Sequence, residues 1–422
     1  MMDLLPDDMV GSILGRLPPC SLAASRCVCK KWCAIIDGQR MLRADLLPLR
    51  LDAFFFLAEE ARVDTYFFSR PSTGRRISGG LTDFLPVDCY GDKMILDHCN
   101  GLLLLWELVA NPARRQAVRL PPFPQPCLEG FHRVFFLAYD PIVSPHHYEV
   151  LLIPLVPTTR IGEDIKIFKE ESEWPPSTFT THVFSSTKWK WEERSFVRQG
   201  NAAGTIADMC SDWHPCRRHA VYFRGALYVH CQNDSVMRIT LRNDKYQMIS
   251  SPAENQELVT YLGKSEKGVY SALLSQGRNR WPRFRVWLLN ESSGQMVWVL
   301  KTDTSLQAMV ENFRMDYTGT PWIVHYERGD ASAEDDDESE WDFDGGIVLH
   351  EAQDKVATHN RKIVFLGFHP YKEVAFFFTS LRVVSYHLNS SKVQELGSLH
   401  EPIDRSFPYT ACWMGELLSK KN

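Results

Sequence analysis

The chain has 422 residues, of which 44% are hydrophobic and 12% aromatic, enough for more than one domain with a large core. Lys and Arg number 47 against 52 Asp and Glu, so the formal net charge is −5. Such a balance provides no global basic field of the kind that attracts nucleic acid. We therefore expect two domains and no nucleic-acid partner.

The compartment is predicted from the start of the chain and from its cysteines. The first residues lack a basic stretch followed by an apolar core, and no apolar run approaches the roughly 20 residues of a membrane span. The 11 Cys are odd in number and lack the spacing of a disulfide framework. We expect reduced thiols, no membrane partner and a location in the cytoplasm, the nucleus or both.

Residues 5–37 have the periodicity of short helices. A first apolar stripe follows Pro6, which is tolerated at a helix start, and two prolines end it. Ser21 is a suitable N-cap for a second helix, and Gly38 closes a third. The stripes of the first and third helices consist of Met9, Ile13, Leu14 and Leu17, and of Val28, Trp32, Ile35 and Ile36. Residues 1–48 are therefore predicted to form a three-helix module.

The first helix contains Gly11 and Gly15, although each glycine inside a helix costs about 1 kcal/mol relative to Ala. A module of about forty residues also has too small a core to be stable alone. We therefore expect its apolar residues to be completed by a partner surface.

The stretch "LPDDMVGSILGRLPPCSLAASRCVCKKWCAIID" resembles an F-box in the order and spacing of its residues. The resemblance covers about a tenth of the chain and rests on Leu5-Pro6, Ile13-Leu14, Arg16-Leu17-Pro18, Ser21-Leu22, Val28-Cys29-Lys30 and Trp32. Two positions depart from the family pattern: Met9 stands where Leu is usual, and Cys33 where Arg often follows the Trp. Met keeps the apolar volume, whereas Cys33 is expected to loosen a surface contact.

The F-box resemblance implies binding to a Skp1 adaptor and, through it, to a cullin and a RING subunit. It also implies a non-catalytic substrate receptor of a ubiquitin ligase. The resemblance implies that ten residues face the adaptor or form the module core, and the sequence does not separate these two classes. They are Leu5, Pro6, Met9, Ile13, Leu14, Leu17, Leu22, Val28, Cys29 and Trp32.

From about residue 50 the pattern changes to short apolar or alternating runs bounded by Gly, Pro, Asn and Ser, which is typical of antiparallel strands. Roughly seven hairpins recur, mostly 30 to 55 residues apart, among them 65–78, 103–122, 135–154, 181–196, 235–250, 284–300 and 381–399. Preceding pairs such as "DHCNGLLLLW" and "AVYFRGALYVH" extend several hairpins to four strands. We predict an all-β domain over 49–415, an irregular kelch-like β-propeller, with a twisted β-sandwich as the alternative.

The same segments resemble, more loosely, the F-box-associated region of large plant F-box families. The resemblance rests on the pieces 99–103, Asn111-Pro112, Arg114-Arg115, 120–122 and 222–230. It covers most of residues 50–400 and implies a receptor domain for an unidentified target protein.

Residues 330–346 interrupt the strand pattern. Six of the seven residues from Glu334 to Glu340 are acidic. Because these charges repel one another and bury nothing, we predict a solvated loop, with a contact for a basic substrate tail as the alternative.

The sequence carries none of the common phosphate-binding, zinc-protease, serine-hydrolase or CxxC patterns, so no cofactor, metal site or catalytic residue is predicted. The set Cys210, Cys216 and His219 has a first gap too wide for a usual zinc site. His98 and Cys99 are neighbours on a predicted strand, where they point to opposite faces and cannot form a nucleophile and base pair.

Two residue sets are candidates for contacts with a ligand or target. Arg pairs on predicted turns can bind acidic or phosphorylated groups, and we name Arg114, Arg115, Arg217 and Arg218. Tryptophans can stack on sugar rings, although at sheet edges they usually pack between sheets, and we name Trp174, Trp189, Trp191 and Trp213.

The resulting hypothesis is a non-catalytic receptor that binds a target protein and brings it to a ubiquitin-loaded enzyme. The alternatives are a carbohydrate-binding or enzymatic propeller with a vestigial F-box, and an F-box protein that acts as a scaffold outside a ligase.

Overall fold

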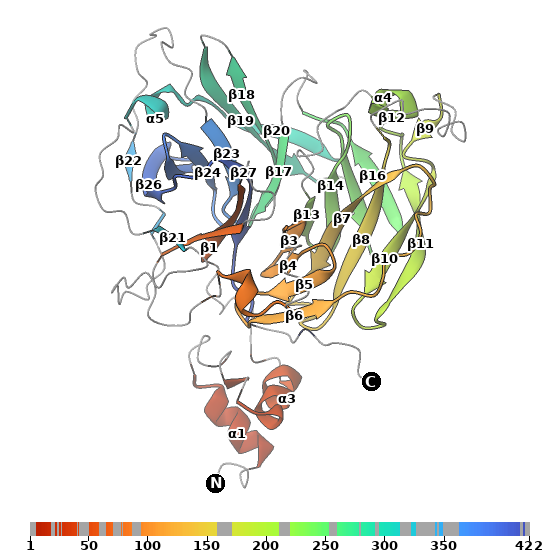
Figure 1. The fold of residues 1–422 in the computed structure, drawn as a ribbon, viewed down its shortest axis with the longest axis vertical. Helices are drawn as coiled ribbons and strands as arrows, with labels where there is room; N and C mark the ends of the chain where they lie inside the picture. The colour runs from red at the N-terminus through yellow and green to blue at the C-terminus, as the bar shows by residue number, and fades with distance from the viewer. Residues whose placement is uncertain are drawn as a thin grey trace.

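The computed structural model shows a small helical module beside a large β domain (Figure 1). It describes residues 6–17, 22, 25–26, 28–39, 41, 50–58, 65–70, 77, 79–86, 94–157, 171–210, 220–252, 260–277, 280–291, 295–312, 322–325, 342–343, 346–348, 363–413 and 417. None of the helices in these ranges is long and apolar enough to cross a membrane.

The helical module contains α1 (Asp7–Leu14) and α3 (Lys30–Gly38), which pack against each other. Their shared core consists of Val10, Leu14, Leu22, Ile35 and Ile36. The predicted first and third helices are thereby confirmed. The predicted second helix falls largely outside the described residues, which include only Leu22, Ser25 and Arg26 of that segment.

The first helix contains a glycine, Gly11, that lies close to the end of α3. It is buried, and a Cβ atom at this position would lie 2.8 Å from Oε1 of Gln39, at the end of α3. A side chain at this position would require the end of the Gln39 side chain to move.

Most sheets of the β domain are small and antiparallel. One sheet holds β1 (Ala53–Ala58), β2 (Thr65–Ser69), β21 (Ile323–His325) and β27 (Ile403–Tyr409), in the order β21-β2-β1-β27. A second sheet holds β3 (Asp97–Cys99), β4 (Leu102–Leu104), β5 (Leu108–Asn111) and β6 (Gln116–Arg119), in chain order. Another holds β17 (Thr260–Ser265), β18 (Gly268–Gly277), β19 (Arg280–Asn290) and β20 (Val297–Ser305), also in chain order. A five-stranded sheet holds β22 (Ile347–Val348), β26 (Lys392–Ser398), β25 (Arg382–His387), β24 (Val374–Thr379) and β23 (Ile363–Phe368) in that order.

An eight-stranded sheet combines two four-stranded units. One unit is β7 (His132–Tyr139), β8 (Tyr148–Leu155), β10 (Thr178–Ser185) and β11 (Lys190–Gln199), and the other is β13 (Ala220–Phe223), β14 (Ala226–His230), β15 (Val236–Thr240) and β16 (Lys245–Ile249). The outer strands β11 and β16 pair in parallel and join the units. The remaining elements are the pair β9 (Glu173–Trp174) and β12 (Gly204–Thr205), and the short helices η3 (Leu81–Asp83), α4 (Ile206–Cys210) and α5 (Gln307–Asn312).

Six of the seven predicted hairpins are confirmed, as the pairs β5-β6, β7-β8, β10-β11, β15-β16, β19-β20 and β25-β26. The hairpin predicted over 65–78 is wrong: β2 pairs with β1 along one edge and with β21 along the other. A local pattern identifies a strand here but carries no information on which distant strand pairs with it.

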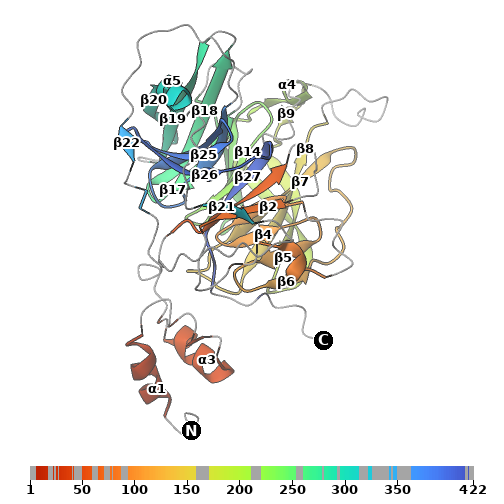
Figure 2. The same cartoon turned by 60° about the vertical axis from the view of Figure 1, so that its left-hand side comes forward.

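The six units, five of four strands and one of five, lie in a circle (Figures 1 and 2). Their innermost strands contact one another in the closed order β27, β3, β7, β13, β17, β23 and back to β27. The unit that closes the circle joins the two ends of the domain, because β27 pairs with β1.

A separate hydrophobic core fills each junction between neighbouring units. In β1, for example, Phe55 packs toward the β3–β6 unit, whereas Phe54 and Phe56 pack toward the β23–β26 unit. This is why the whole of β1 is apolar rather than alternating. The structure thus confirms a large, mostly-β domain after the helical module. The predicted boundary at residue 48 lies outside the described residues, between Met41 and Arg50.

Candidate functional site

The helical module exposes apolar side chains beside its own core. Met9 is 53% exposed, Ile13 46% and Val28 65%, whereas Leu14 is only 1% exposed. Three large apolar side chains open to water on a module this small are typical of a protein-binding surface. We use the name exposed apolar face for Met9 and Ile13, one turn apart on α1, together with Val28, which precedes α3.

The ten residues that the F-box resemblance named differ in how deeply they are buried. Leu14 and Leu22 belong to the module core, and Leu17 and Trp32 are half-buried against it. Pro6 and Cys29 are exposed at the starts of α1 and α3, where Cys29 Sγ accepts a hydrogen bond from the backbone N–H of Trp32 at 3.5 Å. Leu5 lies outside the described residues. Their contact with an adaptor stays a prediction.

The module also contacts the β domain through a polar cluster. The Arg26 guanidinium is buried and donates two hydrogen bonds to Asp37, both at 2.6 Å. It also lies 3.1 Å from Nε2 of His146, in the connection between β7 and β8. Burial raises the pKa of Asp37, but the hydrogen bonds and charge of Arg26 outweigh it and hold this pKa below its usual value. The pair Arg26 and Asp37 therefore stays ionised where the module meets the β domain.

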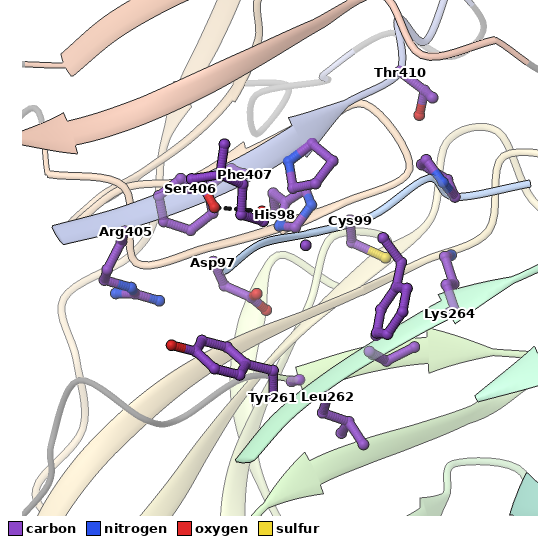
Figure 3. A pocket seen from close by; sticks show the side chains of 18 of the residues that line it. Asp97, His98, Cys99, Tyr261, Leu262, Lys264, Arg405, Ser406, Phe407 and Thr410 are labelled. Atoms are coloured by element: carbon purple, nitrogen blue, oxygen red, sulfur yellow. Dashed lines mark hydrogen bonds between the residues drawn. The ribbon is translucent and has the colours of Figure 1, made fainter. Parts of the chain in front are cut away.

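A cavity of about 670 Å³ lies at the centre of the circle of β units (Figure 3). It is lined by the innermost strands β3, β13, β17, β23 and β27, through residues 97–101, 220–222, 261–264, 364–368 and 404–408, together with Pro370 and Thr410. Figure 3 shows Asp97, Arg405 and Tyr261 toward one side and Cys99 and Lys264 toward the other. Its size matches that of cavities that hold small molecules.

The charges that line this cavity are partly neutralised by burial. Burial raises the pKa of Asp97 to about 7, although the Leu137 backbone N–H donates to its carboxylate at 2.8 Å. Burial, together with the charges of Lys264 and Arg405, lowers the pKa of His98 to about 4. Burial also lowers the pKa of Lys264, whose ammonium donates to Asn100 Oδ1 at 2.8 Å and to the Tyr222 carbonyl at 3.0 Å. His98 is therefore neutral at pH 7.

His98 and Cys99 do not form a nucleophile and base pair. The Cys99 thiol donates to the Tyr139 carbonyl at 3.4 Å, and burial raises its pKa to about 12. The His98 ring instead contacts Phe407 on β27, with ring centroids 5.4 Å apart. The predicted divergence of these neighbours on a strand is confirmed.

The other predicted residues are dispersed. Arg114 and Arg115 lie in the turn between β5 and β6, far along their unit from the cavity-lining strand β3. Trp174 is buried, and Trp189 and Trp191 pack on the core between β3–β6 and β7–β11, so their packing role is supported. Arg217, Arg218, Trp213, Cys216 and His219 lie outside the described residues, as does the acidic segment 330–346 except for Asp342, Phe343 and Gly346.

Sequence reasoning named His98 and Cys99 but missed the cavity that they line. Asp97, Lys264 and Arg405 come from three strands that are far apart in the chain, and no local pattern brings them together. Only the positions of their strands could be predicted.

Comparison with known proteins matches residues 2–43 to the F-box domain model. The N-terminal module is an F-box domain. The Arabidopsis thaliana protein At5g44220, which is named as an F-box protein, is 30% identical over 165 residues, or 36% of this chain and 52% of its own length. A second Arabidopsis thaliana protein named as an F-box protein, At1g47790, is 23% identical over 290 residues, or 61% of this chain and 62% of its own length. The chain thus spans between half and two thirds of these relatives.

Among solved structures, a Bacteroides fragilis protein named as a 6-phosphogluconolactonase aligns with 84% of this chain and 97% of its own. The identity is 7% and the TM-score 0.33, so this likeness supports no conclusion about the F-box chain.

Proposed function

We propose that this F-box protein is the substrate-receptor subunit of an SCF-type ubiquitin ligase. In this role the F-box binds a Skp1-like adaptor, which connects it to a cullin and a RING subunit, and the β domain holds a target protein. The observation that carries the proposal is the exposed apolar face of Met9, Ile13 and Val28 on a domain that matches the F-box model.

The adaptor interaction follows from burial. Removing apolar surface from water contributes about 25 cal/mol per Å², so covering the exposed apolar face favours binding. Leu14 and Leu22 act from within the core, because they hold α1 at the position that presents Met9 and Ile13. Pro6 and Cys29, which are exposed at the two helix starts, extend the same proposed surface.

The test is co-purification of the full chain with a Skp1-like adaptor. We expect Met9→Glu together with Ile13→Glu to abolish binding, because each carboxylate would be buried without a partner. The matched control is Val297→Glu together with Val299→Glu, which changes two side chains that are 52% and 49% exposed on β20. Equal binding by the two double variants would refute the proposed surface.

We infer that the β domain is a six-bladed β-propeller. The closed order of innermost strands and a core at each of six junctions support this architecture over a twisted sandwich, in which two sheets share one core. Pairing of β1 with β27 would close the ring within one blade.

In this proposal no residue of the chain performs covalent chemistry. The rate gain comes from holding the target near the ubiquitin-loaded enzyme, which makes their encounter effectively intramolecular. Loops at the faces of the β domain are the expected target-binding elements, with Arg114 and Arg115 as candidates for an acidic or phosphorylated target. The proposed location is the cytoplasm, the nucleus or both.

A second candidate function, a carbohydrate-binding or enzymatic propeller with a vestigial F-box, is favoured by the central cavity. Its polar groups, among them Lys264 and Arg405, are suited to fixing the orientation of a small ligand. Binding of a glycan by the full chain that is lost in Lys264→Met, together with no binding of the adaptor, would support this candidate over the ligase.

A further inference from the structure

Three side chains that bind metals in other proteins converge on one face of strands β10 and β11. They are Cys127, His182 and Glu193, and one ligand atom from each lies within 4.8 Å of the other two. Cys127 Sγ is 3.1 Å from Nδ1 and 3.9 Å from Nε2 of His182, and Nε2 is 3.6 Å from Oε1 of Glu193. The cluster is separate from the F-box and from the central cavity.

The fold brings the three residues together for local reasons. His182 on β10 lies directly opposite Glu193 on β11 in an antiparallel pair, so their side chains share one face of the sheet. Cys127 lies in the connection from β6 to β7, which crosses the same face. The distance of Cys127 from His182 and Glu193 therefore depends on the contacts that hold this connection against the sheet.

Two hydrogen bonds and an aromatic cluster hold the connection on the sheet. The Trp191 indole donates to the Pro121 carbonyl at 3.1 Å, and the Arg133 guanidinium donates to the Pro124 carbonyl at 2.6 Å. Phe123 packs on Phe135 and on Trp191, with ring centroids 4.9 and 5.6 Å away. These contacts hold the connection so that Cys127 lies beside His182 and Glu193.

The donor set and its spacing match a transition metal of the zinc type. Thiolate sulfur, imidazole nitrogen and carboxylate oxygen are the ligands of zinc, and bonds of about 2.0–2.3 Å in a tetrahedron separate neighbouring ligand atoms by about 3.3–3.6 Å. The separations of 3.9 and 3.6 Å around His182 Nε2 come close to this value. The third separation, between Cys127 Sγ and the Glu193 carboxylate, is within 4.8 Å, so movements of up to about an ångström would bring the three atoms to one ion.

We propose that Cys127, His182 and Glu193 bind one zinc-type divalent ion that ties the β6–β7 connection to strands β10 and β11. Thiolate and carboxylate neutralise the two charges of the ion, and the thiol proton is released to solvent when the sulfur binds. His182 is buried whereas Glu193 is exposed, so an ion bound by both would lie between the core and the solvent. The positive charge of Arg133, which acts on both Cys127 and His182, limits the affinity.

The test is titration of the purified full chain with Co²⁺, which reports its ligands spectroscopically. We expect one equivalent to give a thiolate-to-cobalt charge-transfer band and the visible bands of a tetrahedral ion, and Zn²⁺ to displace it. Cys127→Ser should remove the charge-transfer band, and His182→Gln or Glu193→Gln should weaken binding by about tenfold or more. The matched control is Cys231→Ser, another half-buried thiol, which should leave the spectrum unchanged.

A second readout separates binding from folding. Zn²⁺ should raise the midpoint of thermal unfolding of the wild type and of Cys231→Ser, but not that of Cys127→Ser, while all three unfold alike in the presence of a chelator. A Co²⁺ spectrum without a thiolate band, or equal metal binding by wild type and Cys127→Ser, would overturn the proposal.

Discussion

Ile13 and Leu14 are adjacent in α1, yet one faces water and the other lies in the module core. Leu14 packs with Val10 one turn earlier, whereas Ile13 follows Met9 along an exposed stripe. The spacing of apolar residues predicted the helix but grouped Met9, Ile13 and Leu14 on a single face. A surface that binds a partner and a surface that packs internally have the same apolar composition, so the sequence alone could not divide them.

The two neighbours are expected to respond differently to truncation. Leu14→Ala should destabilise the module by about 2–5 kcal/mol because it opens a cavity, whereas Ile13→Ala should change its stability by less than about 0.5 kcal/mol. Hydrogen exchange of the α1 amides in the full chain measures both effects. Similar loss of protection in the two variants would contradict the assignment of Leu14 to the core.

Asp97 and His98 have opposite effects on the pH dependence of stability. The pKa of Asp97 rises from 3.8 to about 7 on folding, so its contribution to the free energy of unfolding falls as pH rises through this range. The pKa of His98 falls from 6.5 to about 4, so its contribution is lost as pH falls through that range. The two effects oppose each other between about pH 4 and pH 7.

Asp97→Asn should remove the first effect and reveal the second. Relative to the wild type, the variant should gain stability as pH rises from 4 to 7, by a total on the order of 4 kcal/mol. The urea midpoint of the β domain at several pH values measures this difference, and His98→Gln should shift it in the opposite direction. A difference between Asp97→Asn and wild type that does not vary with pH would refute the assignment.

At the scale of elements, the hairpins were the most predictable part of the β domain. The Asn100-Gly101 turn joins β3 to β4, and both residues have positive φ, as an asparagine-glycine hairpin turn requires. Alternating strands on either side of such turns are recognisable within about fifteen residues. The pairing of β1 with β27 cannot be recognised in this way, because some 350 residues separate the two strands and no local pattern indicates that they pair.

Two turn glycines provide a matched pair of substitutions. Gly101 and Gly225 have φ of +90° and +80°, so alanine at either position is strained by about 1–2 kcal/mol. A Cβ on Gly101 would also lie 2.6 Å from the backbone N of Cys412, whereas one on Gly225 meets nothing within 4 Å. Gly101→Ala should therefore be more destabilising than Gly225→Ala by about 1–3 kcal/mol, as measured by denaturant midpoints. Equal losses of stability in the two variants would show that the backbone of Cys412 can move away from Gly101.

At the scale of the whole molecule, strand β27 connects the parts of the β domain. It pairs with β1, contributes Phe407 and Tyr409 to the core and supplies residues 404–408 to the cavity. The sequence could predict that a strand lies near the end of the chain, but not that this strand completes a sheet begun by residues 53–69. For the same reason the cavity, and the approach of Cys127 to His182 and Glu193, could not be predicted from local patterns.

Truncation tests the closure of the ring. A chain that ends after Leu399 lacks β27, and we expect its β domain to lose cooperative unfolding because β1 is left with an unpaired edge. A control chain that ends after Leu417 keeps every described strand and should unfold like the wild type. Thermal unfolding followed by circular dichroism compares the two. A cooperative transition with an unchanged midpoint in the shorter chain would contradict the closure.

The measurement that tests the central proposal most directly is the mass of the complex formed by the full chain, a Skp1-like adaptor, a cullin and a RING subunit, by light scattering after size-exclusion chromatography. We predict a single species with one copy of each, from which Met9→Glu/Ile13→Glu is absent and Val297→Glu/Val299→Glu is not. If the wild-type chain elutes apart from an assembled adaptor, cullin and RING complex, the chain is not a ligase subunit.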